Sequence, residues 1–271
     1  MQYALPIAYA LFLWWFSTGI IFYLDGLPVR TFKWSMAGAT AVFAASLGAI
    51  WATTGETSTL AAYAAFTGAV LCWGWQEISL YMGFVTGTRK HRCAVGCSGW
   101  RHFGHAIQVN LWHEIAIIVT AAVIALVTWN SANQIALWTF LVLWILHLSA
   151  RLNVFLGVRN VSEEFVPEHM AVLKSFLTRK PMNLLFPFSV TAATIGSVLL
   201  FSRAAEATTA FETTGYVFLA TMMTLATLEH WFLMLPLPVE KLFAWSLSSR
   251  KTEKPAPETL KYTLLKSTAA R

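Results

Sequence analysis

The chain has 271 residues, of which 57% are hydrophobic and only 12% are charged, with a formal net charge of +6. A soluble domain carries roughly 25% charged residues, so the composition excludes an ordinary soluble protein and favours a multi-pass membrane protein. The basic residues form no stripe and no recognition motif, which argues against a nucleic-acid partner. Three cysteines are too few for a disulfide framework.

Apolar segments of about the 20 residues that cross a bilayer predict an all-α integral membrane protein with about seven transmembrane helices. The first segment lacks the basic start and the cleavage site of a signal peptide, so we expect it to be retained. In chain order the segments cover residues 3–24, 34–54, 60–84, 106–129, 135–157, 184–202 and 215–236.

Two more segments predict amphipathic helices on the cytoplasmic surface. One begins at Pro167, because proline is tolerated at the first helical position, and the other covers residues 239–247. We therefore expect a single transmembrane bundle over residues 1–238, which includes a cytoplasmic loop at 158–183. An amphipathic segment and a polar tail, both cytoplasmic, complete the chain over residues 239–271.

The positions of the basic residues predict the orientation. If the N-terminus faces outside, all but one of the 19 Lys and Arg residues fall on the cytoplasmic side, and the exception is Arg203. Because cytoplasmic loops of membrane proteins carry the excess of Lys and Arg, this distribution predicts an N-out, C-in topology with an odd number of spans.

Ionisable residues recur at similar depth in four of the predicted helices. They lie about seven residues or fewer from the cytoplasmic ends, which places them on the order of 10 Å below the surface at 1.5 Å per residue. A charge at the centre of a span costs roughly 2.5–3.5 kcal/mol, so such residues are functional candidates. The candidates are Glu77, His113, Glu114, His147, Glu229 and His230.

Four interpretations of this layer remain open. In a buried ionic network, Arg151 and the histidines neutralise the glutamates and lock the helices together. Carboxylates and imidazoles also bind iron, manganese or zinc, although the chain lacks the Glu-x-x-His spacing of two-metal bundle sites and the His boxes of membrane desaturases. His113, His147 or His230 could instead be an axial ligand to the magnesium of a pigment. A proton pathway is the fourth interpretation.

Polar residues continue from the end of the fifth predicted helix into the following loop. Arg151 and Asn153 can turn into the bundle, whereas the rest of the segment lies on the predicted cytoplasmic side, where charge is permitted. We interpret the segment as a lid over the ionisable layer or a ledge that docks a partner. Its capping or docking residues are Arg151, Asn153, Arg159, Glu163, Glu164, Glu168 and His169.

The loop between the third and fourth predicted helices combines cysteine with histidine. Two Cys and two His are a ligand set for zinc, but the Cys-x-x-x-Cys spacing differs from the usual Cys-x-x-Cys, and the glycines of the loop also suit plain turns. A disulfide is not expected on the cytoplasmic side. The alternative is a basic loop that faces lipid headgroups. The candidate ligands are Cys93, Cys97, His102 and His105.

Four stretches carry a resemblance to a known family: GWRHFGHAIQVNLWHE, RLNVFLGVRNVSEEFVPEHMAVLKSF, KPMNLLFPFSV and LEHWFLMLPLP. In them the chain resembles the PuhE-type photosynthetic complex assembly proteins (photosynthetic complex assembly protein 2 family) of purple phototrophic bacteria. The resemblance extends from the third predicted helix to Pro238 and is most specific over residues 151–190.

This resemblance implies a multi-pass protein of the bacterial inner (intracytoplasmic) membrane that is encoded with the reaction-centre H subunit. It also implies a role in assembly of the reaction centre–LH1 complex and in bacteriochlorophyll supply. The partners would be reaction-centre or LH1 subunits and other assembly factors, besides the lipid bilayer. It implies no catalytic residue.

Two functions therefore remain open. The first is a non-enzymatic assembly factor that docks reaction-centre or LH1 subunits, or holds bacteriochlorophyll, through its cytoplasmic surface. The second is a membrane metalloenzyme, such as a di-iron-like, oxygen-dependent oxidase or hydroxylase of a tetrapyrrole or carotenoid. The residues that would serve it are Glu77, His113, Glu114, Glu229 and His230. Motifs for nucleophilic catalysis are absent from the sequence.

Overall fold

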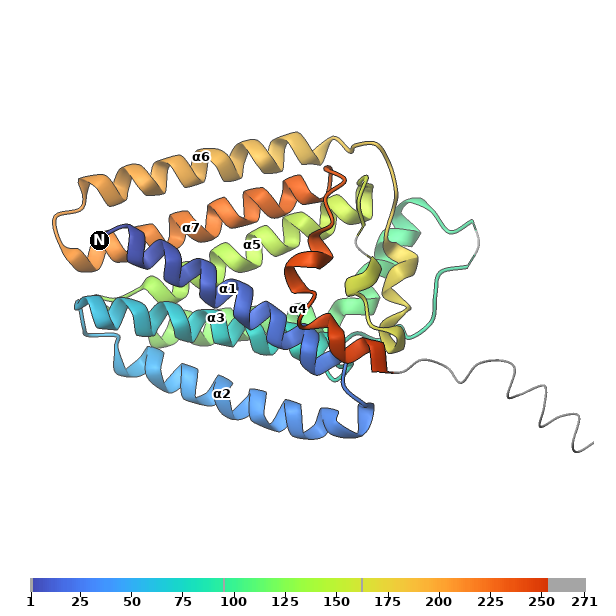
Figure 1. The fold of residues 1–271 in the computed structure, drawn as a ribbon, viewed down its shortest axis with the longest axis horizontal. Coiled ribbons are helices and arrows are strands. Elements are labelled where there is room, and N and C mark those ends of the chain that lie inside the picture. Colours follow the sequence, from blue (N-terminus) through green and yellow to red (C-terminus); the bar gives the residue numbers. More distant parts are fainter. Residues whose placement is uncertain (1, 95, 162, 253–271) are drawn as a thin grey trace, which may run out of the picture.

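The computed structural model describes residues 2–94, 96–161 and 163–252, and within these ranges it contains α-helices and 3₁₀ turns but no β-strand. The helices run side by side along the long axis of the molecule (Figure 1). They are α1 (Ala4–Asp25), α2 (Phe32–Ala52), α3 (Thr59–Tyr81), α4 (Gly99–Val127), α5 (Ile135–Leu156), α6 (Leu185–Glu206) and α7 (Ala210–Phe232). Each corresponds to one of the predicted segments.

Two helices begin earlier than hydropathy predicts, because polar residues form their first turns. α7 begins at Ala210 with a capping box, in which the Thr209 hydroxyl accepts from the Glu212 N–H and the Glu212 carboxylate accepts from the Thr209 N–H. A Thr followed three residues later by Glu is a recognised helix start. α4 begins at Gly99, so that its first turns carry the polar residues of the Cys/His loop rather than an apolar span.

The predicted amphipathic surface helices are instead short 3₁₀ turns. Hydrogen bonds such as that from the Met170 N–H to the Pro167 carbonyl close these turns, and contacts with the bundle hold them in place. For example, Trp245 packs so closely on α1 that a Cβ at Gly19 would lie 2.1 Å from its ring. The predicted polar tail lies mostly in residues 253–271, outside the described residues. The 3₁₀ turns cover Val29–Thr31, Glu163–Phe165, Glu168–Met170, Leu173–Phe176, Val239–Phe243 and Leu247–Thr252.

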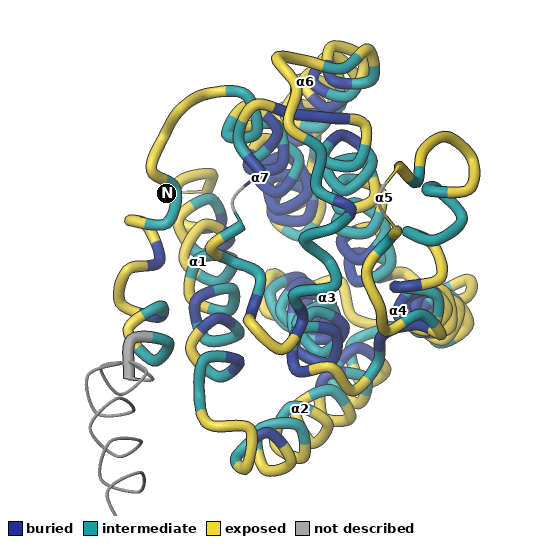
Figure 2. Tube along the Cα trace, turned by 90° about the vertical axis from the view of Figure 1, so that its right-hand side faces the viewer, coloured by how far each residue is buried: buried dark blue, intermediate teal, exposed yellow. Residues whose placement is uncertain are grey.

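α3 and α7 form the centre of the bundle, where the buried residues concentrate (Figure 2). Each buries 12 residues, whereas the other helices bury between 3 and 6. Phe66 of α3 stacks on Phe218 of α7 with ring centroids 4.1 Å apart and an interplanar angle of 10°. The outer helices thus shield α3 and α7 from the surroundings of the protein.

This arrangement explains a difference in hydropathy between the helices. Of the described helices, 5 are long and apolar enough to cross a membrane: α1, α2 with its preceding 3₁₀ turn, α4, α5 and α6. α3 and α7 are less apolar because their neighbours are protein side chains. The prediction of an all-α, multi-pass membrane protein is confirmed at this level. The count of seven spans and the N-out, C-in topology remain predictions.

An ion pair joins three distant segments at the end of the bundle where α1 ends. Arg250 Nη2 donates to Asp25 Oδ1 at 2.7 Å, and Arg250 Nη1 donates to the Glu164 carbonyl at 2.5 Å. Asp25 is only 3% exposed, so its charge depends on this partner. This Asp25–Arg250 clasp connects α1, the loop after α5 and the C-terminal segment. The sequence alone drew attention to neither residue.

Candidate functional site

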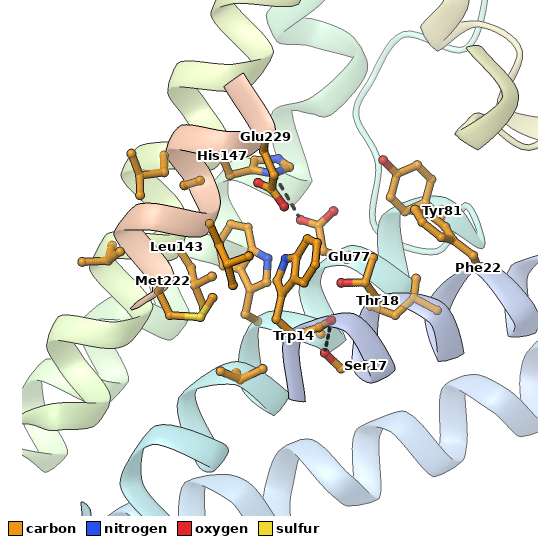
Figure 3. Close-up of a pocket in the computed structure, with 18 residues that line it drawn as sticks. Trp14, Ser17, Thr18, Phe22, Glu77, Tyr81, Leu143, His147, Met222 and Glu229 are labelled. Atoms are coloured by element: carbon orange, nitrogen blue, oxygen red, sulfur yellow. Dashed lines mark hydrogen bonds and ion pairs between the residues drawn. The ribbon is translucent and has the colours of Figure 1, made fainter. Parts of the chain in front are cut away.

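Glu77, His113 and His147 come together inside the bundle from α3, α4 and α5. One ligand atom from each lies within 4.8 Å of the other two. His147 Nδ1 is 3.8 Å from Glu77 Oε1 (dashed in Figure 3). The rings of His113 and His147 have centroids 6.3 Å apart. We call these three residues the Glu/His cluster.

The position of His113 depends on the loop that follows α3. The His113 backbone N–H donates to the Thr86 carbonyl at 3.0 Å. This close approach requires glycine at position 87, where a Cβ would lie 1.9 Å from the Gln108 carbonyl oxygen of α4. The side chain of His113 is completely buried, and neither ring nitrogen makes a hydrogen bond of good geometry to a described residue. Because unsatisfied buried polar atoms are costly, such nitrogens indicate a place for a ligand.

Arg151 links the cluster to Glu114. Its Nη1 donates to Glu114 Oε1 at 2.5 Å and lies 3.4 Å from His147 Nε2. A guanidinium can only donate, so His147 Nε2 accepts, and a neutral His147 carries its proton on Nδ1, the nitrogen that faces Glu77. The chain Glu114–Arg151–His147–Glu77 is the arrangement expected of a buried ionic network across α3, α4 and α5.

Glu77 and His147 also line a cavity of about 170 Å³ between α1, α3, α5 and α7 (Figure 3). Glu229 of α7 enters the same cavity, whose remaining walls are mainly aromatic and aliphatic, with Trp14 on one side. Pockets for drug-sized ligands have volumes of roughly 300–1,000 Å³. The cavity therefore suits water or a small molecule and does not enclose a chlorin macrocycle, which argues against a pigment ligated inside this layer.

His230 lies apart from the Glu/His cluster, although it follows Glu229 directly. Adjacent residues of a helix point about 100° apart, so His230 turns towards α5. Its Nδ1 is 2.7 Å from the Ala226 carbonyl and its Nε2 is 2.9 Å from Ser149 Oγ. With both nitrogens engaged, His230 acts as a structural link between α7 and α5.

Asn153 turns into the bundle and joins α5 to α6. It is fully buried, and its Nδ2 donates to the Ser149 carbonyl at 2.9 Å and to Ser189 Oγ at 3.0 Å. Asn183, which the sequence analysis did not single out, accepts from the Leu185 N–H at 2.9 Å and so caps α6. An Asn directly before an apolar run is the signal that would have found it.

The other predicted capping residues lie on the segment 158–183, which we call the ledge. Glu163 pairs with Arg179 at 2.9 Å. His169 Nε2 lies 2.7 Å from the Tyr81 carbonyl and attaches the ledge to the end of α3. These side chains do not reach the Glu/His cluster. Those that are exposed are Arg159, Glu164, Glu168 and His169.

The Cys/His residues converge where the loop meets the start of α4. Cys93 Sγ lies 3.2 Å from His102 Nδ1 and 3.1 Å from His105 Nδ1, and Cys97 Sγ lies 3.4 Å from His105 Nδ1. Desolvation, and then the neighbouring Cys97, raise the pKa of the Cys93 thiol above its ordinary value. The Cys93 thiol therefore favours its neutral form in the absence of a bound cation.

Residues 1–254 match the model of a family described as "Protein of unknown function (DUF3623)". The chain belongs to this family. The match includes α1 to α7, the Glu/His cluster, the Cys/His residues and the clasp.

The chain is also 36% identical, over 245 residues, to a protein of Rhodobacter capsulatus named "Uncharacterized 30.4 kDa protein in puhA 5'region". The alignment covers 88% of this chain and 89% of that relative. No solved structure matches the chain significantly. The relative agrees with the expected link to a puh-region protein.

Proposed function

We propose that this protein is a PuhE-type assembly factor for the photosynthetic reaction centre–LH1 complex, located in the bacterial inner (intracytoplasmic) membrane. The observation that carries the proposal is the relative from the puhA 5' region, which aligns over nearly the whole chain. The resemblance of residues 151–190 to the assembly proteins implies the same process, assembly of the reaction centre–LH1 complex. The apolar helices support a location in the bilayer, where the subunits that such a factor would help to assemble also lie.

The ledge is the surface that we propose for docking reaction-centre or LH1 subunits. It is held firmly, because Val158 and Arg179 form a backbone bridge and Arg250 donates to the carbonyl of Glu164. Glu164 and Glu168 are exposed on this rigid support. Fixed, exposed charges give a docking surface its specificity and its rate of association.

The experiment is complementation of a strain that lacks the gene. Replacing Glu164→Gln together with Glu168→Gln should lower the near-infrared absorption of the reaction centre–LH1 complex several-fold at an unchanged level of the protein. The matched control is Glu56→Gln with Glu206→Gln, two exposed carboxylates at the opposite end of the bundle, which should restore wild-type absorption. Wild-type complex levels in the gene-deleted strain would contradict the proposal.

Bacteriochlorophyll supply, which the resemblance also implies, is not assigned to the internal cavity, because its volume of about 170 Å³ is too small for the macrocycle. An assembly factor that handles pigment would do so on its outer surface. For the interior, which contains the Glu/His cluster, the candidate function is instead a metal-dependent reaction.

A metal-dependent reaction is the second candidate function, and the geometry of the Glu/His cluster favours it. Two histidines and one carboxylate are the ligand set of many non-haem iron oxygenases. Glu77, His113 and His147 would hold the ion, and iron there would supply oxygen or Lewis-acid chemistry. The contact between Arg151 and His147 Nε2 opposes it, because a guanidinium and a metal ion compete for the same ring.

Metal analysis of the purified protein tests this candidate. Stoichiometric iron or manganese that is lost in Glu77→Gln and His113→Gln, but kept in His169→Gln, would support it. His169 is the matched control because it lies on the ledge and away from the cluster. If the protein contains neither metal, and Glu77→Gln still complements the deletion strain, the metalloenzyme is excluded and the network is structural.

A further inference from the structure

The Cys/His residues form a second cluster, separate from the Glu/His cluster. Cys93 and Cys97 lie in the loop after α3, and His102 and His105 lie one turn apart on α4. One ligand atom from each of Cys93, Cys97 and His102 lies within 4.8 Å of the other two. His105 Nδ1 completes the group through its contacts of 3.1 and 3.4 Å with the two sulfurs.

Hydrogen bonds among these side chains cannot satisfy all the contacts. A ring nitrogen has one hydrogen or one lone pair, not both. His105 Nδ1 nevertheless faces two sulfurs and can share a full hydrogen bond with only one of them, whereas Cys93 Sγ can donate to one Nδ1 and accept from the other. One cation at the centre would be shared by all four atoms and would account for each contact.

The distances agree with tetrahedral zinc. Bonds of about 2.3 Å to sulfur and about 2.0–2.1 Å to nitrogen separate the two ligand atoms by roughly 3.5 Å at the tetrahedral angle. Three of the four sulfur–nitrogen pairs lie at 3.1 to 3.4 Å. The charge also balances, because two thiolates would neutralise a divalent zinc ion.

Packing already orients one of the ligands. The His102 ring stacks between Phe155 of α5 and Phe176 of the ledge. The ring centroids are 5.2 and 5.1 Å away, and the interplanar angles are 21° and 25°. Fixing a ligand in this way lowers the entropy cost of binding, as outer contacts do in known metal sites. An ion here would join the loop after α3, α4, α5 and the ledge.

We propose that Cys93, Cys97, His102 and His105 bind one zinc ion, which holds the loop after α3 against the start of α4 and supports the ledge. The proposal does not depend on the photosynthetic role, because the ion acts on the fold of this end of the bundle. It also does not depend on the Glu/His cluster, which contains no sulfur.

The test uses the full chain, purified under reducing conditions through a tag that contains no histidine. We expect one zinc ion per chain by mass spectrometry. Replacing zinc with cobalt(II) should produce a thiolate-to-cobalt charge-transfer absorption, which a site of Glu and His cannot give. The metal and this absorption should both be lost in Cys93→Ser with Cys97→Ser and in His105→Asn, while the helical circular dichroism remains.

Two matched controls remove the same kinds of side chain outside the cluster. Cys72→Ala removes the buried cysteine of α3, and His91→Gln removes an exposed histidine of the same loop. Both variants should keep the zinc. Folded wild-type protein without zinc or the cobalt absorption would overturn the proposal, as would zinc retained in the double cysteine variant or a Cys93–Cys97 disulfide in cells. Complementation of the deletion strain tests the assembly role, and metal analysis tests the zinc site. Failure of one proposal can therefore be distinguished from failure of the other.

Discussion

At position 87 the loop after α3 runs directly along the backbone of α4. Replacing Gly87→Ala would place a Cβ 1.9 Å from the Gln108 carbonyl, and backbone atoms cannot move aside as a flexible side chain can. We expect a loss of stability of roughly 1–3 kcal/mol, as for other overpacked sites, and a displaced His113. Thermal unfolding of the detergent-solubilised protein measures the first effect, and the metal content measures the second if the cluster binds an ion.

Gly38→Ala is the control for this substitution. Gly38 lies in the middle of α2 with no atom within 4 Å of a Cβ built there. Alanine favours a helix over glycine by about 0.8–1.0 kcal/mol, so the control should be neutral or slightly stabilised. Equal melting temperatures for Gly87→Ala and the wild type would show that the loop does not hold His113 as described.

His113 and His230 show how differently two buried histidines can behave. Both are almost inaccessible, at 0% and 1% exposed. His230 has a partner at each nitrogen, from Ala226 and Ser149, whereas neither nitrogen of His113 has a hydrogen bond of good geometry, and one of its ligand atoms lies within 4.8 Å of Glu77 and His147. The sequence, which places each histidine beside a glutamate, cannot separate a structural histidine from a candidate ligand.

At the scale of elements, the Asp25–Arg250 clasp decides where the C-terminal segment lies. Arg250→Ala would leave the buried Asp25 carboxylate without its partner, which costs roughly 3–5 kcal/mol for a fully buried pair and less here, because Arg250 is 19% exposed. We expect faster hydrogen exchange and faster proteolysis over residues 239–252. Hydrogen exchange followed by mass spectrometry of the peptides measures both the site and the size of the change.

The control for the clasp is Arg203→Ala, which breaks an exposed pair with Glu206 at the other end of the bundle. Exposed pairs contribute about 0–1 kcal/mol, so exchange in the C-terminal segment should not change. Adding Asp25→Asn to Arg250→Ala should recover part of the loss, because the unpaired charge is removed. Unchanged exchange in Arg250→Ala would mean that aromatic packing alone, such as Trp245 on α1, holds the segment.

Hydropathy predicted the existence of every α-helix because the apolar segments are long and separated by polar loops. It misplaced the starts of α4 and α7, whose first turns are polar; a capping box stabilises that of α7, and the first turns of α4 carry residues of the Cys/His cluster. It also predicted amphipathic surface helices where 3₁₀ turns occur. In those segments the contacts with the bundle, such as that of Trp245 with α1 at Gly19, outweigh the periodic pattern that favours an α-helix.

At the scale of the whole molecule, the distribution of Lys and Arg predicts that the ledge faces the cytoplasm. A cysteine introduced as Glu206→Cys should react with a membrane-impermeant maleimide in intact cells from which the outer membrane barrier has been removed. One introduced as Glu168→Cys should react only after the inner membrane is permeabilised. The wild-type chain is the control for its own three cysteines. The opposite pattern of labelling would reverse the topology, and with it the surface proposed for docking.

The sequence by itself determined the class of this protein: an all-α membrane protein, with ionisable groups near one end of its helices and a Cys/His loop. These properties follow from composition and spacing, which do not depend on how the helices pack. Only the tertiary structure decided which groups meet. It joined Glu77, His113 and His147 in one cluster, turned His230 away, and left the exposed charges of the ledge on the surface. It also brought Asp25 to Arg250, 225 residues apart in the chain. The physical reason is that each helix's rotation and neighbours are set by packing, and a hydropathy profile contains no information about either.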